Sequence, residues 1–497
     1  MRNRRPLPKP PIQLLVSTAR PKGPSQAITL TTGQRTGAPT TGPTIGTLHH
    51  RPTAHAAPRE GHDLPGAGHN GPMRFTRLSQ SAYARFIYSQ ERVLFPQLPG
   101  YAEERRSEGA EILEVGVVDD VDGEEKIVAA ALLRYQPWMK VFKRINIAYG
   151  PIMDYSNRDL VRFFFSELRT FAKKDRSVLS IRFNPLVAEK FYDDITPVEH
   201  NPVADTFKAT MSELGGINVQ KEFYDSADIQ ARFFYTKNIA GMSFDDVMKS
   251  VGQVVRTGFN RVGTPGVTIR FLEADEFDVL EEILDHTSDR SEMQKISANA
   301  MEFYKGLKRA KPEKVFAPVA TLNCDDYLAG VESEAQELRT KVRGVDEQEA
   351  MLQAEGKNLA KKQRTARNEA NNRLKVLERR ADETRKHQAE AGNEIVLAGS
   401  LFITCPNELV YLLSGSYREY QSYYGIYLIH RAMFEWATEN GMDRYNTFGI
   451  TGIFTDDASD AGVLHFKRQF KGDVEEFVGT WDIPVRPRRA QLLRTLG

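Results

Sequence analysis

Residues 331–392 restrict the possible folds more than any other part of the sequence, because they contain no Phe, Trp, Tyr or Pro. Apolar residues recur there at spacings of three and four, over 335–352 and again over 370–381. Gly356 lies between the two runs and can end a helix. The pattern predicts two helices that pair as an antiparallel coiled-coil hairpin.

The second half of this segment is basic. Residues 357–386 hold eleven Lys and Arg against four Asp and Glu. One interpretation is a solvated hairpin that serves in dimerisation. Another is a surface that follows an RNA backbone, where each phosphate contact adds salt-dependent affinity. The charge pattern alone leaves both open.

On either side of the hairpin segment, strand and helix patterns alternate. In residues 73–232, "EILEVGVV" and "KIVAAALLRY" indicate adjacent strands, and residues 157–174 have helical spacing. Residues 233–330 and 393–480 repeat this order of elements at similar size. We therefore expect two tandem mixed α/β (α+β) units, the second interrupted by the hairpin, with residues 481–497 packing back on the first unit.

Residues 1–72 differ from all that follows. They hold 12 of the 25 prolines and five of the ten histidines, with nine Lys and Arg against two Asp and Glu. Such a segment buries too little apolar surface to offset its chain entropy, so we expect a disordered basic segment. A start codon assigned upstream of the true one, Met73, would give the same pattern, and both explanations stay open.

Composition excludes several classes of function. The formal net charge of +1 predicts no basic surface over the whole molecule. The two cysteines, Cys324 and Cys405, are far apart, which favours a reducing cytoplasm without disulfides. No run approaches the ~18 apolar residues that cross a bilayer. No Ser-His-Asp order, HExxH, Walker loop or paired CxxC occurs, so an activated protein nucleophile or a bound metal has no support.

Lys467 is the first candidate for a functional residue. It ends an apolar run and lies between Phe466 and Phe470. One interpretation is a lysine at a helix end. The other is a cation that meets an anionic or carbonyl substrate away from bulk water.

Two further stretches carry candidate binding residues. Arg256 and Arg261 lie near an expected helix end, where they either face solvent or clamp a phosphate or carboxylate with their planar guanidinium groups. The stretch "YLLSGSYREYQSYYG" sets five tyrosines around Gly415, either as core and interface residues or as a cleft for a sugar-peptide or a nucleotide base. Its candidate contacts are Tyr411, Gly415, Ser416 and Tyr424.

Three stretches together resemble the Fem-type aminoacyltransferases, FemA and FemX. They are "MKVFKRINIAYGPIMDYSNRDLVRFFFSELRTFAKK", "DRYNTFGITGIFTDDASDAGVLHFKRQF" and "EEFVG", which occur in the family's order. The resemblance covers almost all of residues 73–497, and the inserted hairpin is similar to that of FemA-like members. It implies two tandem GNAT-like acyltransferase domains that use aminoacyl-tRNA to extend the interpeptide bridge of peptidoglycan precursors, with no cofactor and no metal.

The resemblance also suggests roles for single residues. Phe466 and Lys467 fall on the family's Phe-Lys pair, which is tied to the acceptor end of the aminoacyl-tRNA, and we take them as the catalytic candidates. We expect Phe466 and Phe470 to hold the Lys467 ammonium group. Tyr149 falls on a position that lines the precursor site, and Arg105 and Arg256 on basic positions. The family's Ile-x-Lys-Ala is Phe259-Asn260-Arg261-Val262 here, and a tyrosine of FemX-like chains is Leu413, so details of the precursor pocket stay open.

The implied partners are aminoacyl-tRNA and a lipid-linked precursor, lipid II or a nascent bridge. The protein would be cytoplasmic and peripheral to the cytoplasmic face of the inner membrane, as a homodimer or paired with a related Fem protein. The hairpin is similar to the arm of seryl-tRNA synthetase, which favours contact with tRNA. The amino acid transferred and the bridge position are not indicated.

Two alternatives compete with this interpretation. An acetyl-CoA-dependent N-acetyltransferase needs a (Q/R)xxGx(G/A) loop that opens a helix. The nearest stretch, "QFKGDV" at 469–474, ends in valine and leads into a strand-like pattern. The second alternative is a non-enzymatic coiled-coil scaffold with the α/β units as docking domains.

Overall fold

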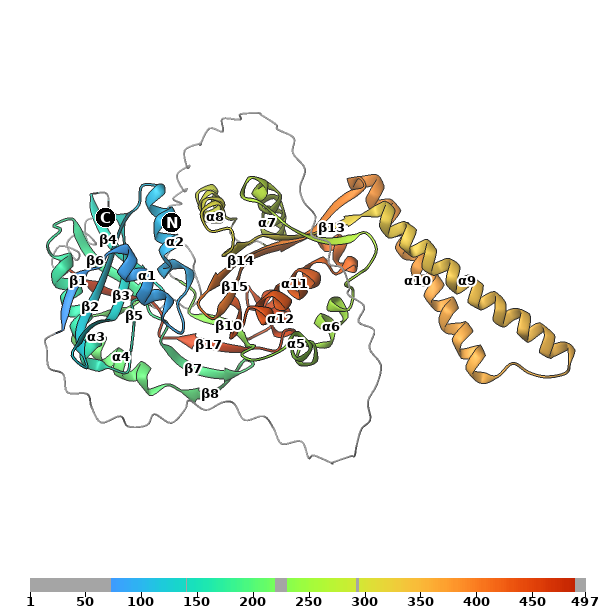
Figure 1. The fold of residues 1–497 in the computed structure, drawn as a ribbon, viewed down its shortest axis with the longest axis horizontal. Coiled ribbons are helices and arrows are strands. Elements are labelled where there is room, and N and C mark those ends of the chain that lie inside the picture. Colours follow the sequence, from blue (N-terminus) through green and yellow to red (C-terminus); the bar gives the residue numbers. More distant parts are fainter. Residues whose placement is uncertain (1–72, 140, 220–229, 292–294, 488–497) are drawn as a thin grey trace, which may run out of the picture. The chain divides into compact units, whose positions relative to one another are not determined.

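The computed structural model describes residues 73–139, 141–219, 230–291 and 295–487 (Figure 1). The expectation for residues 1–72 and the end of the expected C-terminal packing, 488–497, therefore lie outside the described residues. The described part contains two β-sheets with helices on their faces and one long helical hairpin. No helix in these ranges is both long enough and apolar enough to span a bilayer.

Eight of the described strands form the first sheet, in the order β1-β2-β3-β4-β6-β18-β9, with β5 paired to β3. Its strands are β1 (Arg74–Arg77), β2 (Glu111–Val121), β3 (Glu124–Trp138), β4 (Phe142–Ala148), β5 (Ile152–Met153), β6 (Val178–Asn184), β9 (Ile217–Asn218) and β18 (Trp481–Pro484). Its helices are α1 (Gln80–Tyr88), η1 (Phe95–Gln97), α2 (Pro99–Ser107), α3 (Arg158–Ala172) and α4 (Pro202–Glu213).

Helix α3 shows how the sequence builds this sheet's cover. The Asn157 side chain accepts a hydrogen bond from the backbone N–H of Leu160 and so caps the helix start. The apolar positions Leu160, Phe164 and Leu168 share one face and are buried. They enter a core with strand residues of the first sheet and with α4. The helix predicted over 157–174 is thus present.

Ten of the described strands form the second sheet, in the order β11-β13-β14-β15-β16-β10-β17-β7-β8, with β12 paired to β14. Its strands are β7 (Ala188–Asp193), β8 (Thr196–His200), β10 (Phe233–Asn238), β11 (Val267–Phe271), β12 (Val315–Phe316), β13 (Pro318–Asn323), β14 (Glu394–Cys405), β15 (Glu408–Ser416), β16 (Arg444–Ile450) and β17 (Asp473–Phe477). Its helices are η2 (Ala274–Glu276), α5 (Phe244–Ser250), α6 (Gln253–Phe259), α7 (Phe277–Ser291), α8 (Ala298–Ala310), η3 (Arg418–Tyr423), α11 (Gly425–Glu439) and α12 (Ala461–Arg468).

Alternation along β14 separates the two faces of the second sheet. Leu401 and Ile403 enter a core with α7 and α8, whereas Phe402 enters a core with α5, α6 and α11. Successive strand residues point to opposite faces, so one strand supplies both cores. The first of these cores also contains residues of α1, η1 and β3, and it therefore joins the two sheets.

The predicted hairpin is present as α9 (Cys324–Ala354) and α10 (Lys361–Ala391), which pair along their length (Figure 1). Its first helix begins at Cys324, before the expected residue 331, because it continues directly from β13. The Asn323 side chain accepts from the N–H of Asp326 and caps that start. Gly356 has φ +71° and lies in the turn. Arg373 joins the helices through a bidentate ion pair with Glu334, at 2.7 and 2.8 Å.

The course of the chain between the sheets differs from the expected boundaries. Strands β7 and β8 lie within the expected first unit, 73–232, yet they belong to the second sheet, where β7 pairs with β17. Strand β18 returns to the first sheet beside β6. All five residues of β8 are exposed, so no apolar alternation marked its position in the sequence.

Candidate functional site

Lys467 lies in the last turn of α12 and is almost enclosed, with 5% of its surface exposed. Its ammonium nitrogen donates hydrogen bonds to the carbonyl oxygens of Gly449, at 2.7 Å, and Phe448, at 3.2 Å. Burial lowers the pKa of Lys467 from its usual 10.5 to about 7, and the carboxylate of Asp460 opposes this fall. The side chain is therefore close to its titration point at neutral pH.

The carbonyl groups that meet Lys467 are presented by an unusual stretch of backbone. Phe448 has φ +65°, a left-handed conformation that bulky residues rarely adopt. The side chain of Asn446 holds this turn by accepting from the N–H of Phe448 at 2.7 Å. Beyond β16, the carboxylate of Asp460 accepts from both the N–H and the hydroxyl of Thr451, at 2.7 and 2.6 Å. Side-chain hydrogen bonds therefore hold the backbone at Phe448 and again at Thr451, close to the two carbonyl groups that bind the ammonium group.

An ion-pair network anchors this turn to the first unit. Asn446 donates to the fully buried Glu408 at 2.5 Å. Arg92, which follows α1, binds Glu408 at 2.9 and 3.0 Å and Glu475 of β17 at 2.7 and 2.9 Å. Arg92 holds the pKa of Glu475 below its usual value against the effect of burial. A fourfold-bound arginine of this kind restricts movement between the elements it joins.

The expectation that Phe466 and Phe470 hold the ammonium group needs correction. Their ring centroids are 5.2 Å apart, and both rings contact His430 of α11. In the described residues the hydrogen-bonding partners of Lys467 are the two β16 carbonyls, and neither ring makes a cation–π contact with it. The two rings instead fix α12 against α11. Burial lowers the pKa of His430 to about 3, so this ring is neutral where it packs.

Tyr149 lies close to the same turn. Its ring centroid is 6.1 Å from that of Phe448 and 5.6 Å from that of Phe234. The residue is buried, and it has φ +52° at the end of β4. The structure therefore brings both Tyr149 and Lys467 into contact with Phe448, Tyr149 through the ring and Lys467 through the backbone carbonyl.

Arg105 is connected to this turn through aromatic side chains. Its guanidinium carbon lies 3.5 Å from the ring centroid of Phe303 on α8, and Nη1 donates to Glu108 at 2.9 Å. Tyr101 contacts the Phe303 ring and Phe95, and Phe95 contacts Phe448. Arg105 thus sits on the seam between α2 and α8. Burial lowers its pKa, but Tyr101 and Glu108 outweigh that effect and raise the pKa overall.

Arg256 has a different role from the expected clamp. Its guanidinium donates to the carbonyl oxygens of Met248, Lys249 and Val251, at 3.0, 3.1 and 3.0 Å. These carbonyls end α5, where they have no partner within the helix. Arg256 therefore serves as a cap of α5, which corresponds to the interpretation of an arginine at a helix end.

Arg261 and the tyrosine-rich stretch lie near the base of the hairpin. The Arg261 guanidinium lies 5.4 Å from the ring centroid of Tyr424. Arg261 also helps to lower the pKa of Glu334 on α9. The preceding residue, Tyr423, shares a hydrogen bond of 2.8 Å with Thr384 of α10. These contacts join the hairpin to the second sheet rather than to the Lys467 site.

Tyr411, Gly415 and Ser416 are largely accounted for by packing. Tyr411 is buried, and burial raises its pKa to about 12. A methyl group on Gly415 would lie 2.6 Å from the carbonyl oxygen of Ile283, so α7 passes directly over this residue. The N–H of Ser416 donates to Thr287 of the same helix at 3.1 Å. These residues position α7 on β15.

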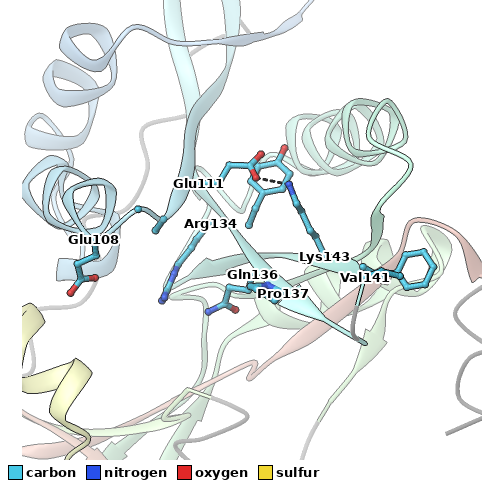
Figure 2. A pocket seen from close by; sticks show the side chains of 11 residues that line it. Glu108, Glu111, Arg134, Gln136, Pro137, Val141 and Lys143 are labelled. Carbon is cyan, nitrogen blue, oxygen red and sulfur yellow. Dashed lines mark hydrogen bonds and ion pairs between the residues drawn. The ribbon is translucent and has the colours of Figure 1, made fainter. Parts of the chain in front are cut away.

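A pocket of about 760 Å³ opens at one end of the first sheet (Figure 2). Glu111 and Lys143 form an ion pair of 2.6 Å in its wall, and Arg134 and Gln136 extend from one side of β3. It contains none of the candidate residues, but Glu108, the partner of Arg105, lines it. Its lining is Glu108, Gly109, Ala110, Glu111, Arg134, Tyr135, Gln136, Pro137, Val141, Phe142 and Lys143.

Four residues around Lys467 were not identified from the sequence: Arg92, Asn446, Phe448 and Asp460. Asn446 and Phe448 lie in "YNTFGI", where Gly449 is the only local signal of an irregular strand end. Asp460 lies in an acidic stretch, in which no local feature separates it from Asp456 and Asp457. The partners of Arg92 lie more than 300 residues further along the chain, at Glu408 and Glu475, so no local pattern could connect them.

Comparisons with known proteins extend over nearly the whole described chain. The model of the FemAB family matches residues 78–497. Aminoacyltransferase FemA of Staphylococcus epidermidis is 29% identical over 426 residues, which cover 85% of this chain and 99% of the relative. FemA of Staphylococcus aureus is 29% identical over 419 residues, which cover 83% and 96%. A crystal structure of FemX superposes with a TM-score of 0.66 at 18% identity, over 84% of this chain and 99% of the other, which shows the same fold.

Proposed function

The chain belongs to the FemAB family and is a Fem-type aminoacyltransferase of peptidoglycan bridge synthesis, and from this we propose how its site acts. The donor is an aminoacyl-tRNA, and the acceptor is an amine of a peptidoglycan precursor, either the stem peptide of lipid II or a nascent bridge. The transfer needs no further cofactor, since the ester of the donor is already activated.

Lys467 stabilises the reaction's developing charge in this proposal. The acceptor amine attacks the ester carbonyl, a C–N bond forms, and negative charge builds on the carbonyl oxygen. An ammonium group has three N–H donors, and two of those on Lys467 bind Gly449 and Phe448. The third donor is left for the oxyanion, a contribution that is typically worth ~10²–10³ in rate.

The lowered pKa supports a second part of the same role. When the tetrahedral intermediate collapses, the C–O bond to the ribose breaks and the ribose oxygen needs a proton. A lysine with a pKa of about 7 can give up that proton far more readily than an ordinary lysine. The proton lost by the attacking amine then restores the ammonium group. The enclosed, carbonyl-bound Lys467 is the observation that carries the proposal.

The precursor is held beside this group by residues of the first unit. We assign Tyr149 to its wall because the ring lies against Phe448. We assign Arg105 to an anionic part of the precursor because the guanidinium lies on the seam between α2 and α8. Phe466 supports Lys467 by fixing α12 on α11. For Arg256 we propose a purely structural role, as the cap of α5.

The hairpin and the cell location complete the proposal. The basic helix α10 contacts the tRNA, and pairing of two subunits through the hairpin is the second possibility. The enzyme works at the cytoplasmic face of the membrane, where a lipid-linked precursor is found. The acetyl-CoA alternative is disfavoured because residues 469–472 close α12 and precede the strand β17, so they do not open a helix as a pyrophosphate loop would.

Transfer of a labelled amino acid to purified lipid II, from each of several charged tRNAs, tests the function directly. Product from one charged tRNA supports the proposal and identifies the amino acid. A parallel assay with lipid II that already carries part of a bridge identifies the acceptor. Absence of product from every donor and both acceptors, together with acetyl transfer from acetyl-CoA, would favour the alternative.

A further inference from the structure

The turn between β3 and β4 carries exposed apolar side chains. Four described residues there, Trp138, Met139, Val141 and Phe142, make up what we call the apolar tip. Val141 is 77% exposed, the highest value among the large exposed apolar residues of the described chain. Phe142, Trp138 and Met139 surround it and are each only partly buried. The guanidinium carbon of Arg144 lies 4.1 Å from the ring centroid of Trp138 and holds the indole in place. One exposed and three partly exposed apolar side chains thus gather at one place on the surface, as is common at interaction sites.

The strand order of the first sheet places this turn at an edge that is rich in Lys and Arg. Strand β4 is parallel to β6, and the loop that precedes β6 follows α3, so the start of both strands lies at the same edge. The backbone N–H of Lys143 donates to the carbonyl oxygen of Ser177 in that loop at 2.9 Å. Strand β18 ends at this edge as well, and Arg486 donates to the carbonyl oxygen of Lys173 at 2.7 Å.

The charge of this edge is unbalanced. We define the basic edge as the charged side chains at the edge where β4 and β6 begin and β18 ends. The basic members are Arg134, Lys143, Arg144, Lys173, Lys174, Arg176 and Arg486, and the acidic members are Glu108, Glu111 and Asp175. Lys173, Lys174 and Arg176 are exposed. The excess of positive charge beside an apolar tip contrasts with the almost neutral chain as a whole.

From these observations we propose that four described residues, Trp138, Met139, Val141 and Phe142, together with the basic edge, dock the enzyme on an anionic lipid bilayer. Val141 and its apolar neighbours enter the interface between headgroups and acyl chains, with Trp138 at headgroup depth. The basic side chains bind the negative headgroups. The inference rests on the proposed function in one respect, since a lipid-linked acceptor gives the docking its purpose.

The pocket of Figure 2 gives the docking a direction. It is lined by Val141, Phe142 and Lys143 of the turn and by Glu108, which pairs with Arg105. The pocket therefore spans the distance from the docked tip to the end of α2. An acceptor whose lipid stays in the bilayer reaches the enzyme from this side.

Vesicle binding by the full chain tests the docking. The probes are vesicles of phosphatidylglycerol mixed with phosphatidylcholine and vesicles of phosphatidylcholine alone, with bound protein measured by flotation. We expect Val141→Asp to lower affinity for the anionic vesicles about tenfold or more, because a carboxylate opposes insertion. Val198→Asp is the matched control, since Val198 is 61% exposed on β8, away from this edge, and its variant should bind like the wild type.

A second pair of variants tests the contribution of the basic side chains to vesicle binding. Lys173→Gln with Lys174→Gln should weaken anionic binding by roughly fivefold for each charge removed, with less effect at high salt. The same change at the exposed pair Lys361 and Lys362 of α10 should leave vesicle binding unchanged. Brominated acyl chains should quench part of the tryptophan emission in the wild type, and Trp138→Phe should remove that quenching.

Two results would overturn the docking. One is equal binding of the wild type and Val141→Asp to anionic vesicles. The other is a change of oligomeric state in Val141→Asp without any change in vesicle binding, which would assign the tip to a second copy of the chain. Transfer to a water-soluble acceptor without lipid separates this inference from the proposed function. Lys173→Gln with Lys174→Gln, at positions outside the pocket lining, should retain that transfer and reduce transfer to the lipid-linked acceptor, whereas a wild type inactive on both would contradict the function alone.

Discussion

The ammonium nitrogen of Lys467 lies 2.7 Å from the carbonyl oxygen of Gly449, in a hydrogen bond that ties the end of α12 to the end of β16. The donor is almost enclosed, and it has no carboxylate within ion-pairing distance among the described residues. A lysine in this setting costs stability, which indicates that it is kept for another reason.

Lys467→Met should lower kcat by about 10²–10³, since it removes the one positioned donor proposed for the oxyanion. The measurement is single-turnover transfer from charged tRNA at saturating acceptor. Lys237→Met is the matched control, because Lys237 is also buried and donates to a backbone carbonyl, that of Lys471 at 3.0 Å. The control should keep its turnover. Full activity of Lys467→Met would reject the assigned role.

The same substitution should change how stability depends on pH. The folded chain binds the Lys467 proton with a pKa of about 7, whereas the unfolded chain binds it with the usual 10.5. Between these values the unfolded state holds more protons, so the wild type gains stability as pH rises from about 7, on the order of a few kcal/mol in total. Below about pH 7 the penalty of burying the charge is fully present.

Lys467→Met lacks this titration, so the difference in free energy of unfolding between variant and wild type should change with pH through that window. Urea unfolding on both sides of about pH 7 measures it. Lys361→Met, at an exposed position of α10, is the control. A difference that stays constant with pH would show that Lys467 titrates normally in the folded protein.

Arg105→Ala should raise the KM for the precursor about tenfold with little change in kcat, because it removes binding that is equal in the ground and transition states. Arg106→Ala is a close control. Arg106 pairs with Glu114 at 2.6 Å within the first unit and has no proposed contact with the precursor. An equal rise of KM in both variants would point to a displaced α2 instead.

Arg256→Ala should lower the melting temperature and leave the KM for the precursor unchanged. The substitution removes three hydrogen bonds to the carbonyls that end α5, a loss of about 1–3 kcal/mol. Thermal unfolding and steady-state kinetics on the same sample separate the two effects. A raised KM at an unchanged melting temperature would restore the clamp interpretation.

Gly415→Ala should destabilise the second unit by about 1–3 kcal/mol, since the new methyl group would lie 2.6 Å from the carbonyl oxygen of Ile283. Gly344→Ala on α9 is the control, because nothing lies within 4 Å of its added methyl group. That control should be neutral or stabilising by about 0.5–1 kcal/mol. Denaturant unfolding of both variants, with the transfer assay, shows whether Gly415 acts through α7 or through the substrate.

Elements with strong local patterns could be predicted from the sequence. Helix α3 and the α9–α10 hairpin were predicted because their apolar spacing and caps lie within the elements themselves. Residues 188–200, which form β7 and β8, lie within the expected first unit, 73–232, but pair in the second sheet, because a strand's partner is not a local property. The family assignment depended on long stretches in a fixed order, and it is confirmed by the family match.

The candidate site likewise contains features that the sequence shows and features that it does not. Lys467 could be singled out because a charged residue in an apolar run is a visible local anomaly. Its actual partners are backbone carbonyls, exposed by the left-handed conformation of Phe448, and no side-chain pattern encodes such groups. For Arg256 the helix-end and clamp interpretations both stayed open, because a charge near an expected helix end does not show which carbonyl oxygens lie within its reach.

The return of β18 to the first sheet has a practical consequence for dissecting the enzyme. Residues 478–480 alone connect β17 in the second sheet to β18 in the first. The chain therefore passes between the two sheets near its C-terminal end as well as near its middle. A fragment cut near residue 232 would carry β7 and β8 without their partner β17, and it would lack β18, which pairs with both β6 and β9. Neither half is a separable module, and swapping halves between relatives would require exchanging three segments at once.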